Sequence, residues 1–78
     1  MPTLREVRVS RLLTMRELAR RAGVALSTVY LLEAGRTRPS LRVIRKLSAA
    51  LGVAPEAVDE FRAVVELSDP SMEAHTPP

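Results

Sequence analysis

The chain has 78 residues and no cysteine, so it is large enough for one small domain and has neither a disulfide framework nor a thiolate metal site. No apolar run approaches the ~20 residues of a membrane helix, and the N-terminus lacks the apolar stretch of a signal peptide, which predicts a cytoplasmic protein without a membrane partner. Residues 1–52 carry a net charge of +8 and residues 53–78 a net charge of −5, a division typical of a polyanion-binding domain; the alternative is a solvated, arginine-rich surface.

Two short motifs mark the starts of the first two predicted helices. Thr3 and Glu6 fit the capping box, in which the threonine oxygen accepts from a free backbone N–H and the glutamate reaches back to the cap. Thr14 and Glu17 repeat the motif. The two motifs predict helices that begin one residue after each threonine, and the second helix is expected at about 15–22.

Apolar residues recur at helical spacing in both segments. The expected core residues are Leu4, Val7 and Leu12 in the first helix and Leu18, Ala19 and Ala22 in the second. Gly23 is expected to end the second helix, because glycine adopts the positive φ of a tight turn without a steric penalty.

Three further helices are predicted downstream. A third helix at about 26–34 buries Val29 and Leu32 and ends at Gly35. Ser40 is a good cap for a fourth helix that ends at Gly52. The apolar residues of this fourth helix at helical spacing are Leu41, Ile44, Leu47 and Leu51.

The fifth helix is expected to begin at Pro55, which suits a first helical turn, and to run to about residue 67. Residues 68–78 are rich in Ser, Asp, Pro and Thr and are predicted to form a disordered tail. The pattern therefore predicts an all-α domain over residues 1–67 without strands.

The chain also contains a longer pattern of residues with defined spacing. It consists of Leu18-Ala19, Gly23-Val24, Ser27-Thr28-Val29, Leu32-Glu33, Gly35-Arg36, Pro39-Ser40 and Ala50-Leu51-Gly52-Val53. This pattern resembles the Cro/C1-type (xenobiotic-response-element-like) helix-turn-helix domain, and the resemblance covers about residues 4 to 60. It implies a compact, lambda-repressor-like bundle of five helices that binds operator DNA, usually as a homodimer. Many members of the family are repressors, some are antitoxins and a few are protein-binding adaptors.

The resemblance also implies which residues contact double-stranded DNA. The recognition helix, at about 26–34, would present to base edges Leu26, Ser27, Tyr30 and Leu31. The residues expected near phosphates are Arg11, Thr14, Met15, Arg16, Ala25, Arg36, Arg38, Ser40 and Arg42. Phosphate oxygens suit helix N-termini, because free N–H groups and the helix dipole point at them. The resemblance further implies an ion pair between Arg8 and Glu33 that locks the first helix to the third.

The sequence departs from the family's pattern at several positions. Met15 replaces the usual glutamine, Ala25 replaces a serine or threonine cap, and Leu12 stands where glycine often ends the first helix. Leu26 and Leu31 are apolar where the family usually has polar or basic residues that read bases. Leucine cannot form the bidentate hydrogen bonds that discriminate between bases.

Two explanations of this apolar recognition helix are open. In the first, the protein reads an A·T-rich site through thymine methyl groups, DNA shape and an arginine in the minor groove. In the second, Leu26, Tyr30 and Leu31 form a patch for a protein partner, as in an adaptor or an antitoxin. The surrounding arginines favour a sequence-specific DNA-binding transcriptional regulator, and we expect a repressor.

The fifth helix carries more apolar residues than one side of a terminal helix requires. We expect some of them to form a two-fold homodimer contact, as paired operators require. The candidates are Val58, Phe61, Val64 and Val65. The alternative is a monomer in which this helix packs on the first helix.

The sequence contains no convincing enzyme site. Ser27 and Thr28 have no neighbouring base that would activate them as nucleophiles. His75 has no partners at metal-ligand spacing. We therefore expect neither catalysis nor a cofactor nor a metal.

Overall fold

The computed structural model describes residues 2–67 of the chain. Within this range the chain forms five α-helices, a single 3-10 turn and no strand, which confirms the all-α prediction. The helices are α1 (Leu4–Ser10), α2 (Met15–Ala22), α3 (Leu26–Glu33), α4 (Leu41–Leu51) and α5 (Asp59–Leu67), with the 3-10 turn η1 (Pro55–Ala57) before α5. Over the same residues, no helix has the length and apolar character of a membrane span. The tail predicted at 68–78 lies outside the described residues.

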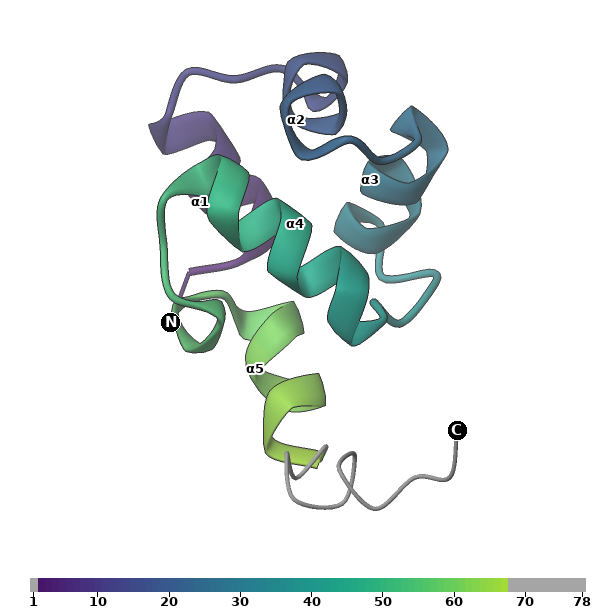
Figure 1. Ribbon diagram of the computed structural model, residues 1–78, viewed down its shortest axis with the longest axis vertical. Helices are drawn as coiled ribbons and strands as arrows, with labels where there is room; N and C mark the ends of the chain where they lie inside the picture. The colour runs from purple at the N-terminus through teal and green to yellow at the C-terminus, as the bar shows by residue number, and fades with distance from the viewer. Residues whose placement is uncertain (1, 68–78) are drawn as a thin grey trace.

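The helix α4 crosses the centre of the molecule, and α2 and α3 lie together at one end of it (Figure 1). At the other end, the N-terminal segment lies beside the start of α5 (Figure 1). There the Asp59 backbone N–H donates to the Pro2 carbonyl over 2.9 Å. The Leu4 backbone N–H donates to Oε1 of Glu60 over 2.8 Å. These two hydrogen bonds tie α5 to the first turn of α1.

The apolar residues that recur at helical spacing in α2, α3 and α4 are buried in a common core. They are Leu18, Ala19, Val29, Leu32, Ile44, Leu47 and Leu51, all of them expected from the sequence. Ala22 and Leu41 are only partly buried and pack against the edge of this core. Because each helix contributes one stripe of apolar side chains, the opposite faces of α2, α3 and α4 are left for solvent.

Both capping boxes are present. Thr3 Oγ1 accepts from the Glu6 N–H over 3.2 Å, and the Thr3 N–H donates to Glu6 Oε1 over 2.9 Å. At α2 the same pair of bonds joins Thr14 and Glu17, with distances of 3.0 and 2.9 Å. The hydrogen bond from the threonine backbone N–H is the main cause that lowers the pKa of Glu6 and of Glu17 below the ordinary value of 4.5.

These lowered pKa values predict a pH dependence of stability. A carboxylate whose pKa is lower in the folded state stabilises the fold above its unfolded pKa and loses this effect as the pH falls through the folded pKa. Below a pH of about 4.5 we therefore expect the melting temperature of the native protein to fall more steeply than that of a Glu6→Gln/Glu17→Gln variant. Thermal melts followed by circular dichroism from pH 7 to pH 3 measure the difference, and parallel curves would contradict the prediction.

The end of α1 differs from the sequence prediction. Leu12 was expected in the core, but it adopts a left-handed conformation with φ 59° and its side chain is 89% exposed. Leu13 is buried instead. The reason is local, because Leu13 precedes the Thr14 cap and Leu18 is the fourth residue of α2, the two apolar positions of a hydrophobic staple. Leu12 therefore occupies a turn, at the position where the family often has glycine.

We expect a Leu12→Gly variant to be more stable than the native protein by about 0.5–1 kcal/mol. A left-handed conformation costs a residue with a Cβ roughly 1–2 kcal/mol, and the greater flexibility of glycine in the unfolded chain offsets only part of this. The exposed Leu12 side chain has little packing to lose. Urea unfolding curves of the two proteins measure the effect, and an unchanged or lower midpoint for the variant would contradict it.

The predicted fifth helix is divided in two. Pro55 begins the 3-10 turn η1, and Val58 then has an extended backbone with φ −114° and ψ 126° before α5 begins. The extended residue turns the Val58 side chain into the core, where it is fully buried. The expectation of a continuous helix from Pro55 was therefore wrong, although the end near residue 67 agrees with α5.

Candidate nucleic-acid interface

The helix α3 is anchored to α1 by an ion pair at its last residue. Arg8 Nε donates to Glu33 Oε2 over 2.6 Å and Arg8 Nη2 donates to Glu33 Oε1 over 3.0 Å, so the contact is bidentate. Arg8 Nη1 also donates to the Leu13 carbonyl over 2.7 Å. Both side chains are nearly buried, with exposed fractions of 11% for Arg8 and 7% for Glu33. The hydrogen bonds to Glu33 raise the pKa of Arg8 above its ordinary value, against the opposing effect of burial.

The outer face of α3 is open to solvent. Its side chains Leu26, Tyr30 and Leu31 are 38%, 54% and 37% exposed. Ser27 is exposed beside them. We call these four residues, which are the ones predicted to face bases, the outer face of α3. It is carried by a helix whose inner side is held in place by the core.

The N-termini of α2, α3 and α4 differ in the charge of the side chains in their first turns. The first turn of α2 holds the carboxylate of Glu17, which is bound to the Thr14 cap. The first turns of α3 and α4 contain no acidic residue. Ser40 caps α4 by accepting from the Val43 N–H over 3.2 Å, whereas Ala25 offers no side-chain cap to α3. Because a nearby carboxylate repels an anion, the starts of α3 and α4 are the more favourable phosphate positions.

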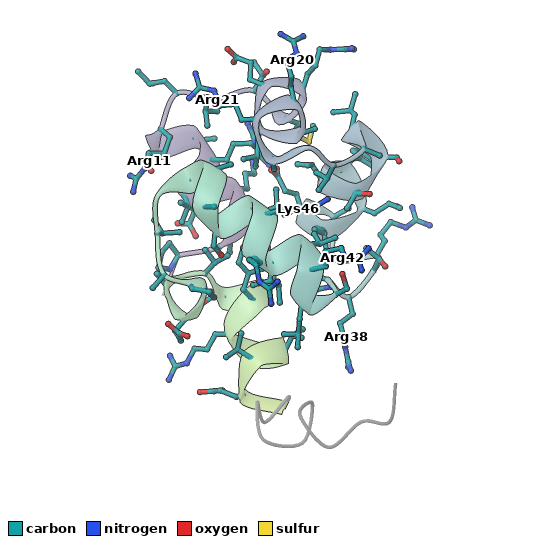
Figure 2. The ribbon with its side chains drawn as sticks, viewed as in Figure 1. Arg11, Arg20, Arg21, Arg38, Arg42 and Lys46 are labelled. Carbon is teal, nitrogen blue, oxygen red and sulfur yellow. The ribbon has the colours of Figure 1, made fainter. Side chains whose placement is uncertain are left out.

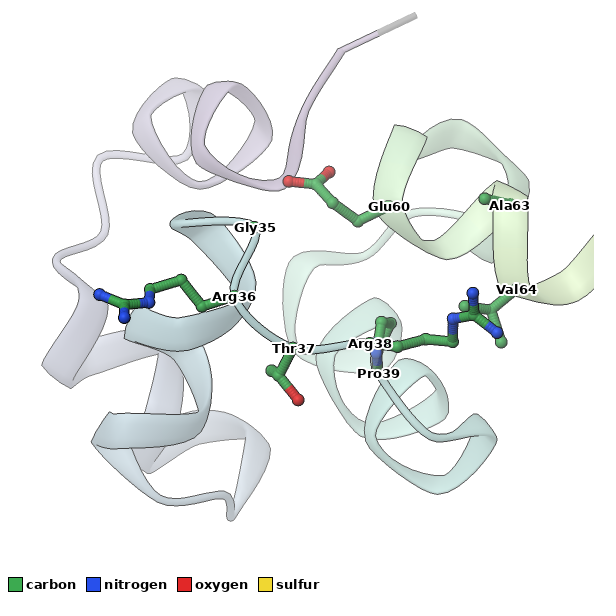
Figure 3. Close-up of a pocket in the computed structure, with 8 residues that line it drawn as sticks. All are labelled: Gly35, Arg36, Thr37, Arg38, Pro39, Glu60, Ala63 and Val64. Carbon is green, nitrogen blue, oxygen red and sulfur yellow. The ribbon is translucent and has the colours of Figure 1, made fainter.

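All five arginines expected near phosphates are exposed, and four of them have no hydrogen bond to another helix within residues 2–67. These four are Arg16 on α2, Arg36 and Arg38 in the loop between α3 and α4, and Arg42 on α4. Figure 3 shows that the Arg36 and Arg38 side chains leave this loop in opposite directions, Arg36 across the end of α3 and away from α5, and Arg38 toward Val64 of α5. Any phosphate contacts of these two arginines would therefore be made to different phosphates.

Arg11 is placed differently from the other candidates. Figure 2 shows Arg11 on the side of the molecule away from α3, whereas Arg38 and Arg42 lie on the same side as α3. Arg11 Nε donates to the Leu51 carbonyl at the end of α4 over 3.1 Å. A cation at this position satisfies a free carbonyl and interacts favourably with the helix dipole. The structure thus gives Arg11 a structural contact and does not bring it together with the outer face of α3.

The dimer candidates in the predicted fifth helix require a correction. Val58 and Phe61 are completely buried in the core of the single chain, and Val64 is nearly so. Val65 alone of the four candidates is partly exposed. The break before α5 turns the first two side chains inward, so they contribute to the stability of the chain and present no surface to a partner.

The comparisons with known proteins give one match. A family model for helix-turn-helix domains of the Cro/C1 type matches residues 4–58, more than half of the chain. This chain belongs to the helix-turn-helix family. Searches of curated proteins and of solved structures found no match. The match supports a DNA-binding regulator of the Cro/C1 type.

In this helix-turn-helix protein, α2 and α3 form the motif, and Gly23 turns the chain between them with φ 71°. Sequence reasoning missed two polar contacts between distant helices. The Glu60 carboxylate accepts from the Leu4 N–H at the start of α1, and the Arg11 guanidinium donates to the Leu51 carbonyl at the end of α4. Both contacts join residues at least 40 positions apart, and no local pattern signals them. Leu13 was also missed, although the hydrophobic staple next to Thr14 was a signal for it.

Proposed function

We propose that this helix-turn-helix protein is a transcriptional repressor that acts in the cytoplasm by binding operator DNA. Its α3 helix would lie in the major groove, with the start of α4 against a phosphate and the start of α2, which Glu17 makes less favourable, near another. One observation carries the proposal: the outer face of α3 is open to solvent, and the loop that follows α3 and the first turn of α4 carry exposed arginines. A protein that occupies an operator in this way excludes other proteins from the site without catalysis.

Selection from a random duplex pool tests the proposal. The protein is titrated against the pool by fluorescence anisotropy across a salt series, and the retained fraction is sequenced. We expect salt-sensitive binding that enriches an inverted repeat, because each phosphate contacted adds about 0.9 to the log–log salt slope. A folded protein that binds no DNA even at low salt would overturn the proposal.

We further propose that the protein binds its operator as a homodimer. An inverted repeat requires a two-fold arrangement of two recognition helices. Of the four residues expected at the dimer contact, Val65 is still exposed enough to contact a partner. It lines an open groove between α4 and α5 together with Leu41 and Pro55. Analytical ultracentrifugation at high micromolar concentration tests this proposal, and a sample that contains only monomer would contradict it.

A protein-binding role is the second candidate function, as in an adaptor or an antitoxin. The observation that favours it is the exposure of Leu26, Tyr30 and Leu31 on one helix. Exposed apolar side chains that lie together are common at protein interfaces. The same selection experiment separates the two functions, because a protein-binding adaptor is not expected to enrich one DNA sequence from the pool.

A further inference from the structure

The outer face of α3 lacks the side chains that usually read bases. The helix has the sequence LSTVYLLE and contains no Arg, Lys, Asn or Gln. Its one charged residue, Glu33, is bound on both carboxylate oxygens by Arg8 and is nearly buried. Discrimination by bidentate hydrogen bonds from this helix is therefore excluded.

The four side chains of the outer face of α3 occupy a defined order around the helix axis. At about 100° per residue, Tyr30 and Ser27 lie near the middle of the outer face, and Leu26 and Leu31 lie at its two edges. The two leucines are also about 7.5 Å apart along the helix axis, roughly the rise of two base pairs. The face thus presents two hydroxyl groups between two separate apolar contacts.

The apolar group that the major groove offers is the C5-methyl group of thymine, which lies beside the O4 acceptor. A leucine placed against this methyl group removes apolar surface from water on both molecules. Against a G·C pair, the same leucine would cover polar base edges without offering them a hydrogen bond, which is unfavourable.

We propose that α3 recognises C5-methyl groups in the major groove, with Leu26 and Leu31 as the specificity-determining residues. The hydroxyl groups of Ser27 and Tyr30 donate to acceptors on the base edges between them. This inference rests on the proposed DNA binding and names the chemistry that the site reads. DNA is favoured over a protein as the occupant because the exposed Arg36, Arg38 and Arg42 match the charge of a phosphate backbone.

Uracil substitution tests the inference with the native protein. The duplex enriched from the random pool is synthesised in two forms, one with thymine and one with deoxyuridine, which lacks only the methyl group. We expect affinity to fall about fourfold for each methyl group contacted, and about 15-fold for two. When a contacted T·A pair is replaced by C·G, binding weakens, and 5-methylcytosine at the same position restores part of the loss.

Variants assign the effect to the two leucines. A Leu26→Ala/Leu31→Ala protein is expected to bind the thymine and uracil duplexes equally, whereas a Val9→Ala control, changed at an exposed residue of α1, keeps the difference. Circular dichroism verifies that each variant is folded.

The outcomes separate the inference from the function on which it rests. If the native protein binds both duplexes equally, the methyl-recognition inference is wrong and DNA binding stands. If the folded native protein binds no duplex at low salt, DNA binding and the inference both fail, and the outer face of α3 belongs to a protein partner.

Discussion

Replacing Glu33 by glutamine is expected to lower the free energy of unfolding by about 3–5 kcal/mol. The variant leaves the Arg8 guanidinium nearly buried without its counter-charge, and the two hydrogen bonds of 2.6 and 3.0 Å lose their ionised acceptor. Small domains are stabilised by only about 5–15 kcal/mol in total, so the loss is a large fraction. Urea unfolding followed by far-UV circular dichroism measures it.

A second ion pair in the same protein provides the matched control. Arg62 and Glu66 are joined over 3.1 Å on α5, with exposed fractions of 46% and 62%. Glu66→Gln is the same chemical change as Glu33→Gln, but solvent screens the exposed pair, so we expect a loss below about 0.5 kcal/mol. Equal losses for the two variants would show that the Arg8–Glu33 pair adds no more to stability than a surface contact.

Replacing both Arg36 and Arg38 by alanine is expected to weaken DNA binding at least about tenfold at moderate salt without unfolding the domain. Both side chains are exposed in the loop after α3, so the core is unaffected. Because their guanidinium groups point in opposite directions, we expect two separate phosphate contacts and a salt slope smaller by about 1.8. Fluorescence anisotropy with the selected duplex across a salt series measures both quantities.

The control for this pair is Arg20→Ala/Arg21→Ala, which removes the same net charge from exposed positions on α2. Figure 2 shows these arginines at the far end of the molecule from Arg38. If both double variants weaken binding equally, the effect is one of overall charge. Unchanged affinity of the Arg36→Ala/Arg38→Ala protein would remove both residues from the interface.

The inner and outer sides of the helix α3 contribute differently to stability. Val29 and Leu32 are buried in the core and Glu33 is held by Arg8, so the inner side determines where the helix lies. Leu26 and Leu31 contribute less to the core because they are partly exposed. The outer face of α3 can therefore change in sequence with little cost to folding, which is consistent with the apolar residues found there.

The sequence by itself determined the helices and most of their boundaries. The starts of α1 and α2 follow from Thr3 and Thr14, and the end of α2 from Gly23, because capping and positive φ depend on residues within one turn. Periodic leucine and valine residues also identified the inner sides of α2, α3 and α4, since burial of a helical stripe repeats every 3.6 residues. The pattern of the helix-turn-helix family, read from the same residues, predicted the Arg8–Glu33 pair that the structure contains.

Only the tertiary structure decided which contacts the apolar residues near α5 and the arginine after α1 make. Phe61 and Val58 are apolar whether they face a partner or the core, and the extended residue before α5 turns them inward. Arg11 is basic whether it binds a phosphate or a carbonyl, and the end of α4 lies within its reach. Whether such a residue faces the core, another helix or a partner depends on how segments distant in sequence pack together. A local sequence pattern carries no information about that packing.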